Sequence, residues 1–208
     1  MRIGIIGAGN IGSALARRFA RVGYEVLLSN SRGPQTLTGL VQEIGGPVRA
    51  VTAAEAAASG EAVVVSIPYG RHRELPAEPL RGKVVVDTCN YYPERDGHDP
   101  DLDEDTTTSS EKIKAHTEAN LVKAFNTLPA ATLRDGGRPK GDPGRLAIPV
   151  SGSDEEAKAV VAGLIRDIGF DAVDAGTLSQ GGRKHQPGTK VYAQALNAAE
   201  LDALLRAE

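Results

Sequence analysis

The sequence has no tryptophan and one cysteine, and aromatic side chains make up only 4% of its 208 residues. The lone thiol, Cys89, excludes an internal disulfide framework. Without large rings, the core must be built from aliphatic side chains. No apolar run approaches the roughly 18 residues of a membrane-spanning helix, and the N-terminus lacks the layout of a signal peptide. These absences predict a cytoplasmic protein with no membrane partner.

A strong charge of either sign is also missing. The 24 Lys and Arg side chains are set against 27 Asp and Glu, giving a formal net charge of −3. This balance argues against a nucleic acid partner. The length suits one domain. We therefore expect a single domain over residues 1–208, in which residues 146–208 form a C-terminal extension.

The opening of the chain carries the most specific pattern. A short apolar run at residues 2–6 leads into a GxGxxG motif, an amphipathic helical stretch and a second apolar run at residues 25–29. This order is typical of a dinucleotide-binding unit. Gly7 permits the tight turn, Gly9 admits a pyrophosphate, and Gly12 allows close helix packing, while the helix N-terminus attracts the phosphates. The predicted pyrophosphate site comprises Gly7, Gly9, Asn10, Ile11 and Gly12.

The end of the second predicted strand indicates which dinucleotide is bound. NAD sites carry an Asp or Glu about 20 residues beyond the glycines. This chain instead has Ser29, Asn30, Ser31 and Arg32, with no carboxylate to repel a 2′-phosphate. Arg32 supplies a fork of charged donors. We predict NADP(H) as the cofactor, with Ser31 and Arg32 binding its 2′-phosphate. The alternative is a polar turn with a solvated arginine.

The remainder alternates between strand and helix patterns, which predicts an α/β fold with a doubly wound, mostly parallel sheet. Thr52 and Glu55 have the spacing of a capping box at the start of a helix. Pro149 predicts an edge position for its strand. Apolar residues from 191 to 205 predict a closing helix. The further predicted strands cover residues 48–51, 62–67, 82–87, 119–125, 146–151 and 170–174.

Ligands of an open α/β sheet lie beyond the carboxyl ends of the strands. The residues that follow those ends are therefore candidates for contact with the cofactor. They are Ser66, Ile67, Pro68, Tyr69, His72, Asn90, Asn126 and Thr127. The sequence shows no obvious acid–base pair. Hydride exchange with a flavin-like ring depends chiefly on positioning two rings, whereas carbonyl reduction requires a proton donor. His72 and Tyr69 are the candidates for that role.

Two charged segments complete the pattern. Residues 96–105 hold six carboxylates, but their spacing does not match an EF-hand, and we favour a solvated acidic loop over a metal site. Residues 180–188 form a Gly-rich basic loop. Its Arg183, Lys184 and His185 are candidates to steer an anionic acceptor, although a solvated loop is the simpler interpretation of the pattern.

Several of these stretches resemble one family. Residues 5–12, 29–32, 65–69, 123–130 and 174–179 are similar to the NADP reductases of the 8-hydroxy-5-deazaflavin coenzyme, F-420. The resemblance implies NADP on the glycine turn and nicotinamide near Ile67, Pro68 and the turn at residues 126–129. It also implies a homodimer that transfers hydride between NADPH and F-420 or a flavin-like acceptor. Two alternatives stay open, namely an NADPH-dependent reductase of a small carbonyl or imine and a non-catalytic NADP sensor.

Overall fold

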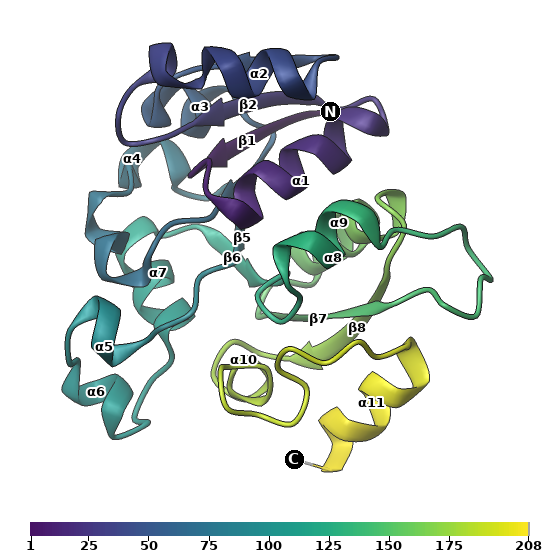
Figure 1. Cartoon of the computed structure of the whole chain (residues 1–208). Helices are drawn as coiled ribbons and strands as arrows, with labels where there is room; N and C mark the ends of the chain where they lie inside the picture. Colours follow the sequence, from purple (N-terminus) through teal and green to yellow (C-terminus); the bar gives the residue numbers. More distant parts are fainter. Residues whose placement is uncertain (208) are drawn as a thin grey trace.

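A computed structural model describes residues 1–207 and shows one mixed sheet with helices on both faces (Figure 1). The strands are β1 (Arg2–Ile6), β2 (Glu25–Ser29), β3 (Val48–Ala50), β4 (Ala62–Val65), β5 (Val84–Asp87), β6 (Asn120–Lys123), β7 (Ala147–Gly152) and β8 (Asp171–Gly176). Within the described residues they form an eight-stranded sheet in the order β3-β2-β1-β4-β5-β6-β7-β8. Every neighbouring pair is parallel except β6 and β7. The predicted doubly wound, mostly parallel sheet is confirmed.

The order in which successive strands join the sheet reverses beside β1. From β1 the strands first extend outward to β2 and β3, and β4 then pairs on the other side of β1. In open α/β sheets such a switch point opens a crevice at the carboxyl ends of the strands. The GxGxxG motif lies at this crevice because it directly follows β1.

The expectation that Pro149 marks an edge strand is wrong. β7 lies between β6 and β8. Its pairing with β6 is confined to Ser151 and Gly152, so the missing N–H of Pro149 falls beyond the end of that short ladder. Proline is therefore tolerated in an interior strand because one neighbour pairs with only two of its residues.

The helices agree with the sequence patterns, with differences at their ends. Thr52 and Glu55 form the predicted capping box. The closing helix begins only at Ala198, and residues 88–105 include two single-turn helices. The α-helices are α1 (Asn10–Arg21), α2 (Thr38–Ile44), α3 (Ala53–Ser59), α4 (Ala77–Leu80), α5 (Pro93–Asp96), α6 (Pro100–Asp103), α7 (Ser109–Thr117), α8 (Ala130–Asp135), α9 (Glu155–Asp167), α10 (Gly181–Lys184) and α11 (Ala198–Ala207), and the 3-10 helices are η1 (Pro34–Leu37) and η2 (Tyr69–Glu74). Within residues 1–207, no helix combines the length and the apolar character that crossing a membrane requires.

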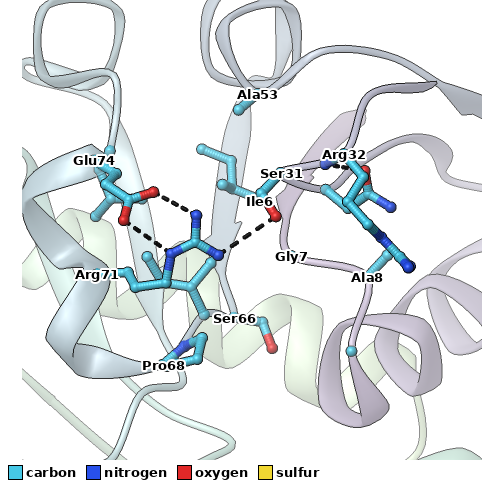
Figure 2. A pocket seen from close by; sticks show the side chains of 14 residues that line it. Ile6, Gly7, Ala8, Ser31, Arg32, Ala53, Ser66, Pro68, Arg71 and Glu74 are labelled. Atoms are coloured by element: carbon cyan, nitrogen blue, oxygen red, sulfur yellow. Dashed lines mark hydrogen bonds and ion pairs between the residues drawn. The ribbon is translucent and has the colours of Figure 1, made fainter. Parts of the chain in front are cut away.

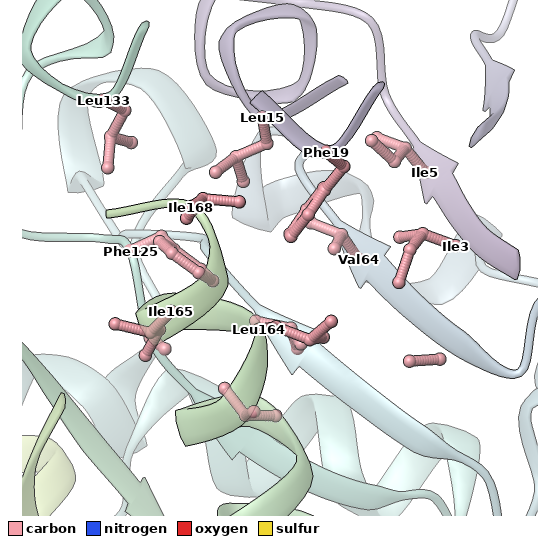
Figure 3. Close-up of a cluster of buried hydrophobic side chains, with 14 of the residues drawn as sticks. Ile3, Ile5, Leu15, Phe19, Val64, Phe125, Leu133, Leu164, Ile165 and Ile168 are labelled. Atoms are coloured by element: carbon pink, nitrogen blue, oxygen red, sulfur yellow. The ribbon is translucent and has the colours of Figure 1, made fainter. Parts of the chain in front are cut away.

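The core is aliphatic and lies on both faces of the sheet, as the shortage of aromatics requires. On one face, α1, α8 and α9 cover the strands, and Phe19 and Phe125 are fully buried among Leu, Ile and Val side chains (Figure 3). On the other face, α3, α4 and α7 cover the alternate residues of the same strands. A third, smaller cluster joins α11 to β7. The two main layers hold the strand ends in fixed positions.

Candidate functional site

The glycine turn after β1 has the geometry that a dinucleotide site requires. Gly7 has φ +110°, and a Cβ atom there would lie 2.0 Å from the Ser66 carbonyl oxygen. A Cβ atom on Gly12 would lie 1.9 Å from the Gly7 carbonyl oxygen. Around Gly9, by contrast, no atom of the described residues other than Gly9 and its immediate chain neighbours lies within 4 Å of such a Cβ. The turn is therefore packed against β4 and α1, while Gly9 leaves an open side next to the first helical N–H groups.

A cavity of about 450 Å³ opens on that side (Figure 2). It is bounded by the glycine turn, the segment after β2 and the segment after β4. Its lining includes these predicted cofactor residues: Gly7, Gly9, Asn30, Ser31, Arg32, Ser66, Ile67 and Pro68. Asn10, Gly12 and Ser29 are among the predicted cofactor residues that are absent from the described lining. Ser29 is fully buried, and its hydroxyl donates to the Ile5 carbonyl at 2.9 Å, so it joins β2 to β1.

The turn after β2 exposes the predicted phosphate-binding groups. The Asn30 side-chain oxygen accepts a hydrogen bond from the Arg32 backbone N–H at 3.0 Å, and the side-chain nitrogen donates to the Thr36 hydroxyl at 2.9 Å. Asn30 thus shapes the turn instead of presenting its side chain freely. Within residues 1–207, the Arg32 guanidinium has no hydrogen-bond or ion-pair partner. Together with the exposed Ser31 hydroxyl, it is available to an anion.

Arg71 is a residue of this cavity that the sequence reasoning missed. It lies on η2, and its Nη1 approaches the Ser31 hydroxyl oxygen at 3.4 Å. Glu74, three residues later, holds the same guanidinium through bonds of 2.9 and 2.5 Å. In Figure 2, Arg71 and Arg32 lie on opposite sides of Ser31. The i, i+3 spacing of Arg71 and Glu74 is the sequence signal that could have indicated Arg71, whereas the predicted cofactor residue is its neighbour His72.

His72 and Tyr69 do not have the predicted position. Both are absent from the described linings of this cavity and of the second one. The Tyr69 side chain is 3% exposed and stacks on the His72 ring with a centroid separation of 4.7 Å. Nδ1 of His72 lies 3.0 Å from the Tyr69 carbonyl oxygen, and burial lowers the pKa of the imidazole. This stacking within η2 corrects their assignment as candidate proton donors, because neither side chain lines either cavity.

A second cavity, of about 310 Å³, adjoins the first and shares Ser66 and Ile67 with it. It lies beyond the ends of β4, β5 and β6. Of the predicted cofactor residues, Ile11, Asn90, Asn126 and Thr127 line it. Its other polar side chains are Thr88, Tyr92, Arg95 and Tyr192. Of these, Tyr92, Arg95 and Tyr192 were not predicted. Tyr192 lies more than 60 residues along the chain from β6, and nothing in its local sequence indicates that it returns to this edge.

A chain of hydrogen bonds fixes the amides of the second cavity. The amide nitrogen of Asn126 donates to the Asn90 side-chain oxygen at 3.0 Å and to the His185 carbonyl oxygen. Nδ1 of His185 lies 2.9 Å from the Asn126 side-chain oxygen, and Nε2 lies 2.8 Å from the Ser151 hydroxyl. A neutral imidazole that donates from Nδ1 and accepts from Ser151 satisfies all these groups. Asn126 is therefore locked in one orientation, and Asn90 with it.

The predicted role of the basic loop is corrected by the same geometry. His185 is fully buried, and burial followed by the charge of Lys123 lowers its pKa well below the usual range. It cannot supply a positive charge to an acceptor at neutral pH. Arg183 is paired with Asp105, and Lys184 donates to the Leu205 carbonyl oxygen at 2.6 Å. The loop is held by the fold and is absent from the described linings of the two cavities.

The acidic segment is also held by specific contacts. Lys112 forms ion pairs with Asp99 at 2.5 Å and with Asp101 at 2.8 Å. Asp96 pairs with Arg95 at 2.7 Å and accepts the backbone N–H of Gly70 at 3.1 Å. Among residues 1–207, no cluster of three His, Cys, Asp or Glu side chains has the arrangement of a metal site. The carboxylates tie α5 and α6 to α7 and η2, in place of the solvated loop that the sequence suggested.

Comparison with known proteins decides the family. Residues 2–91 match the family described as NADP oxidoreductase, coenzyme F420-dependent. The crystal structure of an inferred F420-dependent NADP reductase from Arthrobacter sp. FB24 is 31% identical, with a TM-score of 0.73 and 88% of each chain covered. The chain belongs to this family. Its members are NADP oxidoreductases, so the chain is a member of an NADP(H)-binding reductase family.

Other relatives extend the comparison. The crystal structure of the hypothetical protein SMa0349 from Sinorhizobium meliloti is 34% identical, with a TM-score of 0.82 and 95% of each chain covered. The metalloreductase STEAP3 of Rattus norvegicus is 27% identical over 192 residues, which cover 86% of this chain. The chain spans about a third of that relative, 34% of its length. An imine reductase from Myxococcus stipitatus, with a TM-score of 0.61 at 19% identity, shares the fold alone.

Proposed function

We propose that this family member transfers hydride between NADPH and a deazaflavin or flavin-like acceptor. The observation that carries the proposal is the meeting of two cavities at Ser66 and Ile67. The first cavity has the groups for the adenosine and pyrophosphate of NADPH. The second has the groups for a planar acceptor. Ile67 at the junction gives the nicotinamide an apolar surface on which one face of the ring stays open.

The charges of the first cavity favour NADPH over NADH. Arg32 and Arg71 contribute two positive charges and Glu74 one negative charge, which leaves a net charge of +1 around Ser31. No aspartate lies in the described lining to accept bonds from an unmodified ribose. A 2′-phosphate brings the negative charge that this arrangement lacks. Arg32→Asp should therefore weaken NADPH binding much more than NADH binding.

The second cavity supports a second candidate, the reduction of a small carbonyl or imine. Such a reaction needs a proton donor beside the hydride acceptor, and the tyrosine hydroxyls of this cavity provide one. A third possibility, a non-catalytic NADP sensor, shares the first cavity but has no use for the second.

Turnover assays separate these candidates. Purified protein is mixed with NADPH and one acceptor, and the loss of NADPH absorbance is followed with the F-420 deazaflavin, FMN, a small aldehyde and a cyclic imine. Turnover with the deazaflavin or FMN supports the proposal. Turnover restricted to the aldehyde or imine replaces it with the second candidate. Tight NADPH binding without turnover of any acceptor favours the sensor. Calorimetry with Arg32→Asp, beside the control Arg73→Asp, tests the cofactor assignment without an acceptor.

A further inference from the structure

We propose that the Tyr192 hydroxyl is the proton donor to the reduced acceptor, and that Tyr92 and Asn90 stabilise the phenolate that remains. This inference rests on the proposed function, because it assigns the acid for the hydride transfer described above. It replaces His72 and Tyr69, which stack on each other within η2 and are absent from the described linings of both cavities. Three observations carry it: the position of Tyr192 on the cavity wall, its hydrogen bonds and the strained backbone that holds it there.

An uncommon backbone conformation holds Tyr192 at the cavity. Ala193 has φ +58°, which is uncommon for a residue with a side chain, and its N–H donates to the Thr127 carbonyl oxygen at 2.9 Å. Phe125, just before Asn126, has φ +64°. Such conformations persist where the surrounding structure enforces them, and they concentrate at functional sites. Here both flank residues of the same cavity. Val191 anchors the segment from the other side, since its side chain is buried against α11.

Hydrogen bonding gives the Tyr192 proton a direction. The locked amide of Asn90 donates to the Tyr192 oxygen at 3.3 Å, because its own orientation is fixed by Asn126. The hydroxyl oxygens of Tyr92 and Tyr192 lie 2.5 Å apart. When Tyr92 donates across this contact, the Tyr192 oxygen accepts two hydrogen bonds and its own proton is free to point into the cavity. The same two donors would then hold the phenolate.

The local electrostatics suit a donor that is protonated at rest. Burial is the largest cause that raises the pKa of Tyr192 to about 12. The hydroxyl therefore keeps its proton until the acceptor gains electron density. Arg95 also lines the cavity, with its guanidinium 4.9 Å from the centre of the Tyr92 ring, and its charge acts to lower the pKa of Tyr192. Its positive charge favours the phenolate that forms.

The reaction balances with reactants that the proposal names. NADPH gives hydride from its nicotinamide to the acceptor and becomes NADP⁺. A heteroatom of the acceptor takes the proton as the O–H bond of Tyr192 breaks; in a flavin-type molecule this heteroatom is an electron-rich ring nitrogen. Water then returns a proton to the phenolate. In sum, NADPH, one proton and the oxidised acceptor give NADP⁺ and the reduced acceptor.

The test compares Tyr192→Phe, Tyr92→Phe and the control Tyr24→Phe, whose hydroxyl bonds Asp167 and which is absent from the described linings of both cavities. For each variant, kcat with the best acceptor, its solvent deuterium isotope effect and the NADPH Kd without acceptor are measured. We expect Tyr192→Phe to lower kcat about 100-fold and to lose the isotope effect, with the NADPH Kd within twofold of the parent. Tyr92→Phe should lower kcat about tenfold, because one of two donors to the phenolate is lost. Tyr24→Phe should match the parent.

Each of the following outcomes would overturn either the assignment of Tyr192 as the proton donor or the proposed function. If Tyr192→Phe keeps kcat within threefold of the parent, or keeps the isotope effect, Tyr192 is not the donor and the proposed function stands. If it weakens NADPH binding as much as it lowers kcat, its role is structural and the inference fails. If the parent itself reduces none of the acceptors, the proposed function fails and the donor fails with it, because no acceptor receives the proton.

Discussion

Replacing Arg71 tests the proposed recognition of the NADPH 2′-phosphate. Its guanidinium lies 3.4 Å from the Ser31 hydroxyl and is oriented by two bonds to Glu74. Arg71→Leu removes a charge-assisted donor and leaves the Glu74 carboxylate facing the phosphate. A single charged hydrogen bond at a partly exposed site accounts for about tenfold in affinity, and the uncompensated carboxylate adds a further factor of about three. We therefore expect the NADPH Kd to rise about 30-fold.

The double variant Arg71→Leu/Glu74→Gln separates the two contributions. It removes the donor and the repelling carboxylate together, so the NADPH Kd should rise only about tenfold. Glu74→Gln alone leaves Arg71 unneutralised, and the NADPH Kd should stay equal or fall by up to about threefold. Arg73→Leu is the matched control, since this exposed arginine lies on the same 3-10 helix outside the described lining of the cavity.

Isothermal titration calorimetry at low salt with NADPH, NADH and 2′,5′-ADP measures the parent protein and all four variants. The NADH Kd should change less than threefold in each, because NADH lacks the 2′-phosphate. The differences should shrink in high salt, since both side chains of the pair are largely exposed. Equal losses for NADPH and NADH with Arg71→Leu would refute the reasoning, and so would a double variant as weak as the single one.

Three further predictions concern the glycine turn and two buried groups. Gly12→Ala places a Cβ atom 1.9 Å from the Gly7 carbonyl oxygen, and we expect scanning calorimetry to show a Tm about 6–12 °C lower than that of the parent. Gly9→Ala should keep the Tm of the parent and lose NADPH affinity. Equal Tm values for the two variants would contradict this. The lowered pKa of buried His185 keeps it neutral when folded. Below the pKa of the unfolded state, roughly 6.5, the unfolded chain binds a proton that the folded chain does not. The free energy of unfolding should therefore decrease as the pH falls, by up to about 1.4 kcal/mol per pH unit, and His185→Asn should flatten that slope in urea titrations. Burial raises the pKa of the Cys89 thiol, so a thiol reagent at pH 8 should label it only in denaturant, and fast labelling of the native protein would contradict the burial.

The adenosine half of the site could be predicted from the sequence because its signals are local. Gly7, Gly9 and Gly12 are placed by one continuous strand–turn–helix, and Ser31 and Arg32 directly follow β2. Arg71 was not predicted as a site residue because the path of η2 decides which of its side chains faces the cavity. His72 and Arg71 are adjacent in sequence, yet one packs on Tyr69 and the other reaches Ser31.

The acceptor half could not be predicted because it depends on tertiary contacts. Tyr192 reaches the cavity only through the return of the chain after β8 and the bond from Ala193 to Thr127. His185 reads as basic in the sequence, but its burial between Ser151 and Asn126 makes it neutral. Pro149 led to a wrong prediction of an edge strand, because whether a proline fits an interior strand depends on how far the β6–β7 ladder extends. A homodimer stays a prediction, which analytical ultracentrifugation would test.

The reversal between β6 and β7 has a consequence for how this protein can diverge. Residues 6–75 supply the described lining of the first cavity, while Tyr192 and Ala193 of the second cavity come from the segment after β8, beyond the reversed pair. Exchanges or insertions in that segment can alter the second cavity and leave the lining of the first unchanged. A graft of residues 177–197 from a relative would therefore change these two lining residues alone, because the rest of the second lining comes from residues 11–129.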